Sequence, residues 1–166
     1  TGAQKKNDYY NFLGQPFAQY VRLDADIRYN VRINDISSVV YRAFTGVGIP
    51  YGNSRAIPFE KQYFGGGAND IRAWMVRTLG PGSYVLPEKA FINQTADIKL
   101  IGNVEYRFKL FWILEGATFL DIGNIWTFRN DVGRPGGQFK FNSFIDDLAV
   151  GTGVGLRFDI KFVLLR

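Results

Sequence analysis

The chain has 166 residues, and its 19 Gly, 9 Tyr and 15 Phe against only 6 Pro favour many β-strands joined by turns. Because it contains no Cys and no His, Cys/His zinc sites, thiol nucleophiles and Ser-His-Asp triads are excluded, and we expect no enzyme, cofactor or metal ion. The net charge of +5 comes from Lys and Arg scattered among 15 acidic residues, which argues against nucleic acid as a partner.

The first predicted element is a β-strand over residues 17–30, FAQYVRLDADIRYN, in which apolar and polar side chains alternate with a period of two. The apolar face carries Val21, Leu23, Ala25, Ile27 and Tyr29. The opposite face carries Arg22, Asp24, Asp26, Arg28 and Asn30. Because arginines flank the two aspartates on one face, this pattern predicts a ladder of opposite charges rather than an acid–base or metal site.

A less regular strand over residues 38–48 precedes a long connection, from about Ile49 to Thr95, whereas hairpin loops usually have about two to five residues. The centre of this connection reads FEKQYFGGGANDIRAWMVRTLGPGSY. Three glycines permit a tight backbone path, and a Gly-Pro-Gly run provides a second turn. The three glycines are Gly65, Gly66 and Gly67. A connection of this length indicates a function of its own.

Three more strands are predicted after the loop, over residues 101–111, 114–126 and 149–160, of which the second alternates less regularly. In the first, Val104, Tyr106, Phe108 and Leu110 oppose Asn103, Glu105, Arg107 and Lys109. In the last, the apolar residues oppose Gly151, Gly153, Gly155, Arg157 and Asp159. These glycines lack the spacing of a nucleotide loop, and we expect them to leave room for the folded loop. Residues 162–166 start a sixth strand.

The alternation alone fits a soluble β-sandwich as well as a membrane β-barrel, since both have one apolar and one polar face. Membrane helices are excluded, because Arg, Asp, Asn or Gly interrupts every apolar run well before the roughly 20 residues that a membrane helix needs. Strands of about ten or more residues and aromatic residues near strand ends favour the barrel. These aromatic residues are Tyr20, Tyr29, Trp112 and Trp126. The charged face would then line a wet lumen.

The predicted strands are too few to close a barrel, which requires about eight. An open sheet in lipid would leave unpaired backbone groups along both edges, so we expect the remaining strands to come from a longer protein or another chain. We interpret the end at FVLLR as a truncation. The start, TGAQKKNDYYNF, lacks the apolar core of a signal peptide, as expected for a processed or internal fragment.

The run FGGGANDIRAWMVRTLGPG resembles the hallmark of the BamA/TamA superfamily of outer-membrane assembly and translocation barrels, also called the bacterial surface antigen family. In that family, a long sixth extracellular loop folds into the lumen and carries the motif [VI]-R-G-[FW]. The matching residues here are Ile71, Arg72, Ala73 and Trp74. Ala73 departs from the motif's glycine, which bears on the backbone because Ala does not freely adopt positive φ, but the arginine is retained. LIGNVEYRF, FLDIGNIW and GTGVGLRFDI resemble the family's last barrel strands in sequence order, so the resemblance covers residues 17–166.

The resemblance implies that residues 1–166 are the C-terminal portion of an all-β, antiparallel transmembrane barrel, contributing about five or six of about 16 strands, without its periplasmic domains. It also implies that Arg72 contacts acidic residues on the lumen wall. Strand parity independently supplies Asp121 as first candidate and Glu105 as second. A bidentate pair would stabilise the loop by about 1–3 kcal/mol. The alternative is an ordinary solvated loop arginine.

The resemblance further implies a factor that inserts β-barrel proteins into the bacterial outer membrane or translocates polypeptides across it. Its implied partners are the lipid bilayer, client β-barrel proteins, accessory lipoproteins and the remainder of the barrel. A passive, porin-like channel with a charged lumen is the alternative function. An outer-membrane enzyme would need a nucleophile with a base, and without His among these residues its site would lie elsewhere in the parent chain.

Overall fold

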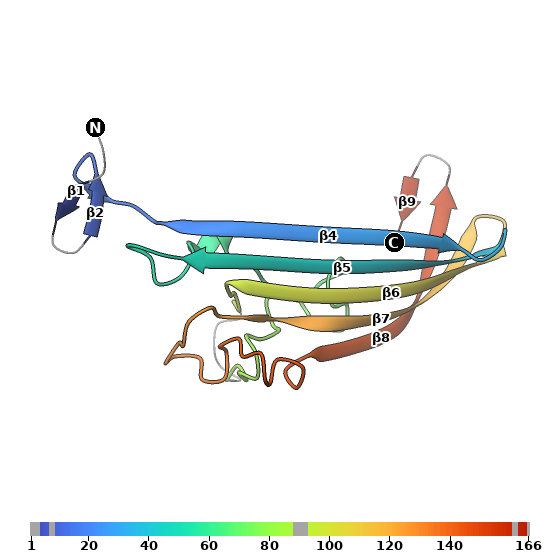
Figure 1. Cartoon of the computed structure of the whole chain (residues 1–166). Helices are drawn as coiled ribbons and strands as arrows, with labels where there is room; N and C mark the ends of the chain where they lie inside the picture. Colours follow the sequence, from blue (N-terminus) through green and yellow to red (C-terminus); the bar gives the residue numbers. More distant parts are fainter. Residues whose placement is uncertain (1–3, 7–8, 88–92, 161–162, 166) are drawn as a thin grey trace.

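The chain folds into antiparallel β-sheets, and the computed structural model describes residues 4–6, 9–87, 93–160 and 163–165. Six strands form one sheet in the order β4-β5-β6-β7-β8-β9 (Figure 1). Their bounds are β4 Tyr20–Arg32, β5 Ser37–Pro50, β6 Ile98–Phe111, β7 Leu114–Trp126, β8 Ala149–Ile160 and β9 Val163–Leu165. A 3-10 helix spans Phe59–Lys61. The predicted all-β antiparallel fold is confirmed, and none of the described helical turns is long and apolar enough to cross a membrane.

A separate small sheet near the N-terminus was not predicted from the sequence. It contains β1 (Gln4–Lys6), β2 (Tyr9–Phe12) and β3 (Gln15–Pro16). Asn53 connects it to the start of the long β5–β6 connection, accepting a hydrogen bond from the Tyr10 amide at 2.7 Å and donating one to the Tyr10 carbonyl at 2.6 Å. Asn53 also donates to the Phe17 carbonyl at 3.0 Å, and β4 begins at Tyr20, three residues later than predicted.

The register of the large sheet aligns like faces across all the long strands. Tyr29, Tyr41, Val104 and Leu120 are successive partners in one row, which belongs to the apolar face. The next row belongs to the opposite face, here called the charged face, and contains Arg42, Asn103, Asp121 and Gly151. Because a slip of one residue would exchange the two faces, the alternation in the sequence specifies this register. The predicted last strand is present as β9, although Phe162 and Arg166 lie outside the described residues.

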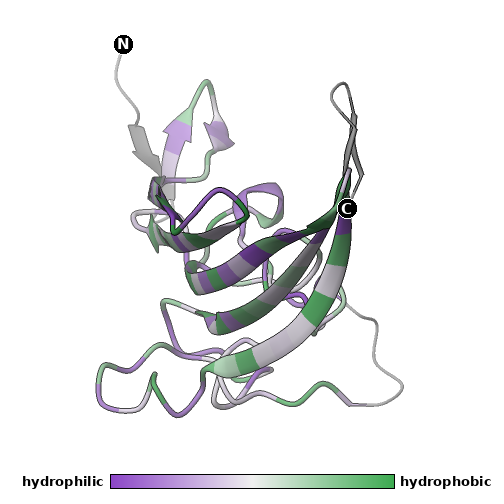
Figure 2. Cartoon of the chain, turned by 90° about the vertical axis from the view of Figure 1, so that its right-hand side faces the viewer, coloured by the Kyte–Doolittle hydropathy of each residue, from purple (hydrophilic) through white to green (hydrophobic). Residues whose placement is uncertain are grey.

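The two faces differ in exposure in the way that separates a membrane sheet from a soluble sandwich. Val104 and Tyr106 on the apolar face are 38% and 40% exposed. The side chains of Glu105 and Arg107 on the charged face are only 20% and 22% exposed. Hydrophilic and hydrophobic residues alternate along the strands in Figure 2. A sandwich would bury the apolar face against a second layer, whereas here the long β5–β6 connection covers part of the charged face.

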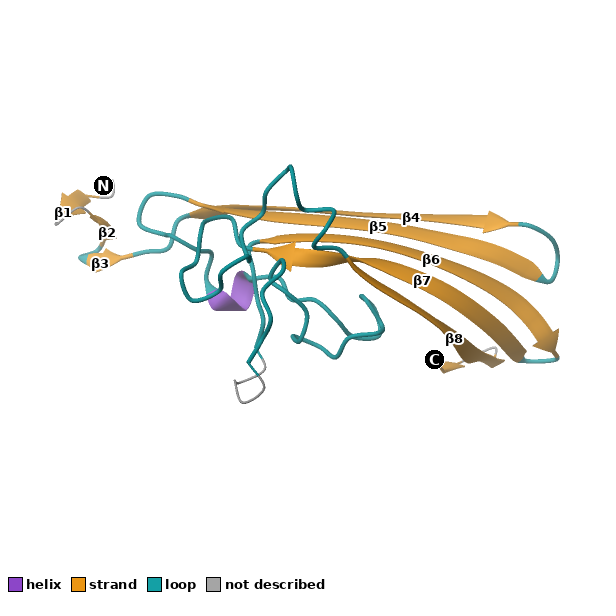
Figure 3. Ribbon diagram, turned by 90° about the horizontal axis from the view of Figure 1, so that it is seen from below, coloured by secondary structure: helices purple, strands orange, loops and turns teal. Residues whose placement is uncertain are grey.

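The cover of the charged face is the long β5–β6 connection, which lies beside one end of the strands and includes the short helix (Figure 3). Tyr63, Ala96 and Ile125 form its buried centre, with Phe44 packed against them. Two glycines of β5 make this packing possible. A Cβ on Gly46 would lie 2.6 Å from the Tyr63 ring, and a Cβ on Gly48 would lie 2.6 Å from Ile57.

The connection between β7 and β8 turns the end of β7 into a second packed region. Trp126 is fully buried beneath Phe139 and Phe144, with ring centroids 5.5 Å and 6.4 Å away. Its indole Nε1 donates to Asp147 Oδ2 at 3.1 Å. Trp126 thus lies at a strand end, as predicted, but it is buried by protein, whereas Tyr29 and Trp112 are exposed.

Candidate functional site

The candidate site is the contact between Arg72, in the long connection, and two carboxylates on the charged face. The backbone amide and Nε of Arg72 donate to Asp121 Oδ2 at 3.0 Å and 2.8 Å, and Nη2 donates to Asp121 Oδ1 at 2.7 Å. Arg72 Nη1 donates to Glu105 Oε2 at 2.5 Å. The structure thus places the Arg72 side chain against both acidic residues that strand parity selected. One loop residue therefore binds to β6 through Glu105 and to β7 through Asp121.

The surrounding residues balance the charges of this contact. Asp121 is fully buried and also accepts a hydrogen bond from Asn103 Nδ2 at 2.8 Å. Arg107 Nε donates to the second oxygen of Glu105 at 2.7 Å, so two guanidinium groups face two carboxylates. Burial alone would lower the pKa of Arg72, but its hydrogen bonds to Asp121 and Glu105 raise it above its ordinary value. The guanidinium therefore stays charged and serves as an attachment point rather than a proton donor.

An aromatic ring beneath the guanidinium completes the contact. Arg72 Cζ lies 3.6 Å from the centroid of the Phe119 ring, a cation–π arrangement. The ring in turn lies over Gly153 of β8, where a Cβ would come within 2.6 Å of it. Gly153 thus makes room for a strand side chain and not, as expected, for the loop. Sequence reasoning missed Phe119, although it shares a face with Asp121 and is the register partner of Gly153.

The other motif residues position the arginine. Ile71 is fully buried, and the Trp74 amide donates to the Ile71 carbonyl at 3.1 Å, which closes a turn around Arg72. A Cβ on Gly151 would lie 2.7 Å from the Ala73 Cβ and 3.4 Å from the Trp74 ring, so this glycine does leave room for the loop. Ala73 is not among the residues with positive φ, and replacing the motif's glycine imposes no such strain.

The three glycines of the loop have different roles. Gly66 and Gly67 adopt φ values of 91° and 101°, and a Cβ on Gly66 would collide with the Met75 carbonyl. Gly65 has no positive φ and instead packs closely against Leu79, 3.0 Å from where its Cβ would lie. Gly67 donates from its amide to the Trp74 carbonyl at 2.8 Å, which joins the glycine run to the motif.

A second attachment point holds the start of the connection against β4. The Tyr63 hydroxyl donates to Asp24 Oδ1 at 2.6 Å and accepts from Arg22 Nε at 3.0 Å. Arg22 Nη1 donates to the Lys61 carbonyl at 2.9 Å. Burial and the bond to Asp24 raise the pKa of Tyr63 to about 12. The hydroxyl therefore remains a donor at physiological pH.

Further contacts attach the middle of the connection to β5 and β6. Lys99 Nζ donates to Asp70 Oδ2 and to the Phe64 carbonyl, at 2.6 Å and 2.7 Å. Arg42 Nη1 donates to the Asn69 carbonyl at 2.6 Å and pairs with Asp26 at 3.0 Å. The predicted charge ladder of β4 is present too, with Arg22–Asp24 and Arg28–Asp26 pairs at 3.1 Å and 3.0 Å. Four neighbouring strands thus bind one loop.

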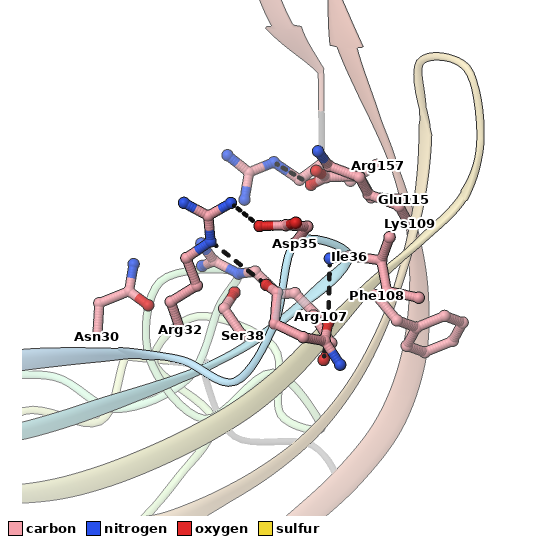
Figure 4. A pocket seen from close by; sticks show the side chains of 12 residues that line it. Asn30, Arg32, Asp35, Ile36, Ser38, Arg107, Phe108, Lys109, Glu115 and Arg157 are labelled. Carbon is pink, nitrogen blue, oxygen red and sulfur yellow. Dashed lines mark hydrogen bonds and ion pairs between the residues drawn. The ribbon is translucent and has the colours of Figure 1, made fainter.

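The charged face stays open at the end where β4 turns into β5 (Figure 4). A hollow of about 610 Å³ lies there, lined by charges of both signs. The charged residues that line it are Arg32, Asp35, Arg107, Lys109, Glu115 and Arg157. Arg32 pairs with Asp35 at 2.5 Å, and Arg157 lies 3.8 Å from Glu115. Arg107 lines this hollow and also donates to Glu105 in the contact around Arg72, so the two share a residue.

Comparison with known proteins places the chain in a family. A search of curated proteins finds no match. The Omp85 superfamily domain matches residues 7–166, which is nearly the whole chain. Proteins of this superfamily are outer-membrane proteins of an insertion and translocation family. With its antiparallel sheet and its loop attached to the charged face, the chain belongs to the Omp85 superfamily.

Proposed function

We propose that this chain is the C-terminal part of the barrel of a BamA/TamA-type protein in the bacterial outer membrane. The parent protein inserts β-barrel proteins into that membrane or translocates polypeptides across it, without making or breaking covalent bonds. The observation that best supports this proposal is the attachment of the loop, through Arg72, to Asp121 and Glu105 on the charged face of the sheet. The motif that resembles the family hallmark is the part of the loop that binds the wall.

The exposure of the apolar face supports a position in lipid. The apolar face continues across β4 to β8. Its side chains are largely exposed at both sides of the sheet, as Leu23 and Ile27 of β4 and Val154 of β8 show. An exposed apolar surface of this extent is unfavourable in water and is stable when covered by hydrocarbon chains. The lipid bilayer is accordingly the first partner, and the charged face lines the lumen.

The open edges of the sheet support a larger barrel. β4 and β9 each pair with only one neighbour among the described strands. Backbone donors and acceptors at such edges need partners within a membrane, and the remainder of the parent barrel supplies them. At the seam between the first and last strands of the barrel, beside locally thinned bilayer, an incoming client strand pairs by β-augmentation. Client β-barrel proteins and accessory lipoproteins are the remaining partners.

The loop contributes by keeping the wall of β4 to β7 in one arrangement. Its contacts with Asp24, Asn103, Glu105 and Asp121 fall on three separate strands. A wall that is rigid here concentrates movement at the seam, where a client strand has to enter. Among the described residues of the loop, Arg72 makes the most bonds to acidic residues, so its removal tests this function most directly.

The test uses the full-length protein reconstituted in liposomes, with an unfolded small β-barrel protein as client. We expect the wild-type protein to accelerate folding of the client into the bilayer and Arg72→Ala to lose most of that acceleration. Arg129→Ala, which removes an exposed arginine of the β7–β8 connection, is the control and should behave as wild type. A passive channel would give ion conductance without acceleration, and Arg72→Ala would change only the conductance. That result would overturn the proposal.

A further inference from the structure

We infer that the end of the β7–β8 connection, residues Phe139–Leu148, is a second membrane contact that lies in the boundary between lipid headgroups and acyl chains. This inference rests on the proposed position of the apolar face in lipid. Phe139–Leu148 is here called the aromatic turn segment. In the sequence it reads FKFNSFIDDL, with three phenylalanines, Ile145 and Leu148 among four charged or amide side chains.

Part of the aromatic turn segment lies on the apolar side of the sheet, while at its end the Asp147 carbonyl accepts a hydrogen bond from the same Asn124 amide group that donates to Gly82 of the long connection. Phe144 and Leu148 line a shallow apolar groove of about 330 Å³ together with Ile27, Leu100 and Ile122. Leu100 and Ile122 share the face of Val104 and Leu120, which is the apolar face. The segment directly precedes β8, below the ends of the long strands in Figure 1. The apolar surface thus continues from the strands onto the segment without interruption.

Part of the segment is anchored, and part of it is exposed. Phe139 and Phe144 pack on the buried Trp126, and Asp147 accepts the indole hydrogen bond. Phe141 packs edge to face on Phe139 with centroids 5.0 Å apart, yet it is 87% exposed. Ile145 is exposed as well. Because the ends of the segment are held, these two apolar side chains are presented outward by a fixed support rather than by a free loop.

The backbone of the segment suits a region of low water content. Consecutive turns satisfy several of its amides. Ser143 and Phe144 donate to the Lys140 carbonyl at 3.2 Å and 2.9 Å, and Leu148 donates to the Ile145 carbonyl at 3.2 Å. Lys140 itself is exposed next to Phe141. Transmembrane barrels carry girdles of aromatic residues at both membrane interfaces, and the continuity with the apolar face selects lipid as the partner.

The test places a fluorescent probe at single introduced cysteines, which the absence of Cys from these residues permits. The variants are Phe141→Cys in the segment, Val154→Cys on the apolar face of β8, and Val85→Cys in the β5–β6 connection. These positions are matched, since they are 87%, 81% and 83% exposed. The labelled full-length protein is reconstituted in phosphatidylcholine–phosphatidylglycerol liposomes. Quenching is then measured with aqueous iodide and with lipids that carry a doxyl group near the headgroup or deep in the acyl chain.

We expect the probe at residue 141 to be quenched most by the shallow doxyl lipid, the probe at residue 154 by the deep one, and the probe at residue 85 by iodide. If residue 154 is quenched by doxyl lipid but residue 141 is as accessible to iodide as residue 85, the inference is overturned while the proposed function stands. Shielding of residue 141 from both quenchers would mean that protein covers the segment, which also overturns it. Absence of doxyl quenching at residue 154 would overturn the proposed function and this inference together.

Discussion

At Arg72, four donors of a single residue bind two carboxylates on neighbouring strands. Asp121 is the carboxylate that depends most on this contact, because it is fully buried. Without Arg72 it would keep only the Asn103 side-chain amide as a hydrogen-bond partner. A buried carboxylate without a compensating charge is more costly than the loss of the ion pair itself. The contact therefore stabilises the loop chiefly because its loss would leave the buried Asp121 carboxylate without a compensating charge.

Replacing this arginine should destabilise the folded protein strongly. We expect Arg72→Ala to lower the free energy of unfolding by about 3 kcal/mol, the size found when one partner of a buried ion pair is removed. Arg72→Lys should lie between this variant and wild type, because an ammonium group cannot bind Asp121 through two parallel bonds. Urea unfolding in liposomes measures both, with the exposed Arg129→Ala as control. Equal stability of Arg72→Ala and Arg129→Ala would show that the contact holds nothing.

Tyr63 offers a residue whose contribution should depend on pH. Its hydroxyl bond to Asp24 is worth about 1 kcal/mol by the usual measure, so Tyr63→Phe should be less stable than wild type by that amount at neutral pH. The pKa of Tyr63 is raised from 10.0 to about 12. A group whose pKa is raised on folding contributes stability that is complete below its unfolded pKa and is lost as pH rises through its folded pKa.

The difference between wild type and Tyr63→Phe should consequently stay constant below pH 10 and shrink between pH 10 and about 12. Unfolding free energies of the two proteins, measured in parallel across this range, test the expectation. Taking the difference removes the titration of lysines and of the other tyrosines, which both proteins share. A difference that does not change up to pH 12 would contradict the role given to the hydroxyl.

The sequence predicted part of the residue-level contact for a clear physical reason. Alternation with a period of two residues specifies which side chains share a face of a strand. This pattern placed Asp121 and Glu105 on the wall that a folded loop would meet. It says nothing about how far a loop side chain reaches or where the loop crosses the sheet. Phe119, Tyr63 and Lys99 were missed because their roles depend on that path.

At the scale of elements, the three glycines of β8 differ in which side chains pack against them. Gly151 faces Ala73, Gly153 faces the Phe119 ring, and Gly155 has no atom within 4 Å of the position of a Cβ. From the sequence all three were expected to serve the loop, since they alternate on one face with equal spacing. The loop covers only one end of the strands, so just the glycine nearest that end serves it (Figure 3).

Alanine substitutions in β8 should reproduce this division. Gly151→Ala should destabilise the protein by about 1–3 kcal/mol, because the added methyl group overlaps Ala73 and displaces the motif. Gly155→Ala adds the same methyl group to open space on the same strand and should change stability by less than about 0.5 kcal/mol. Thermal unfolding of the two variants in identical liposomes makes the comparison. Equal losses would indicate that β8 tolerates no side chain here for reasons unrelated to the loop.

The long strands were predictable, whereas the connections between them were not. The strands β4, β6 and β8 show the alternation in their own sequences, β5 and β7 show it less regularly, and the observed bounds differ from the expected ones by a few residues at most. The β7–β8 connection has no such period, and its packing on Trp126 follows from contacts between residues far from any repeat. Short strands such as β3, with two residues, carry too little pattern to be recognised.

At the scale of the whole molecule, the direction of the two faces decides between a membrane sheet and a soluble one. In a soluble protein, an exposed position accepts a charge with little change in stability, wherever it lies. In a barrel, the same charge on the lipid side has to be stabilised in hydrocarbon, at a cost that depends on depth. Two exposed valines allow this comparison, Val154 at the middle of β8 and Val132 in the β7–β8 connection.

We expect Val154→Arg to lower the free energy of unfolding in liposomes by about 2–4 kcal/mol, the range for a cation near the bilayer midplane. Val132→Arg should leave it unchanged within about 0.5 kcal/mol, because this residue is 92% exposed in a connection beyond the strand ends. Both variants carry the same added charge, so the difference between them reports the environment of β8 alone. If both valines accept arginine equally well, β8 faces water, and the apolar face needs a cover other than lipid.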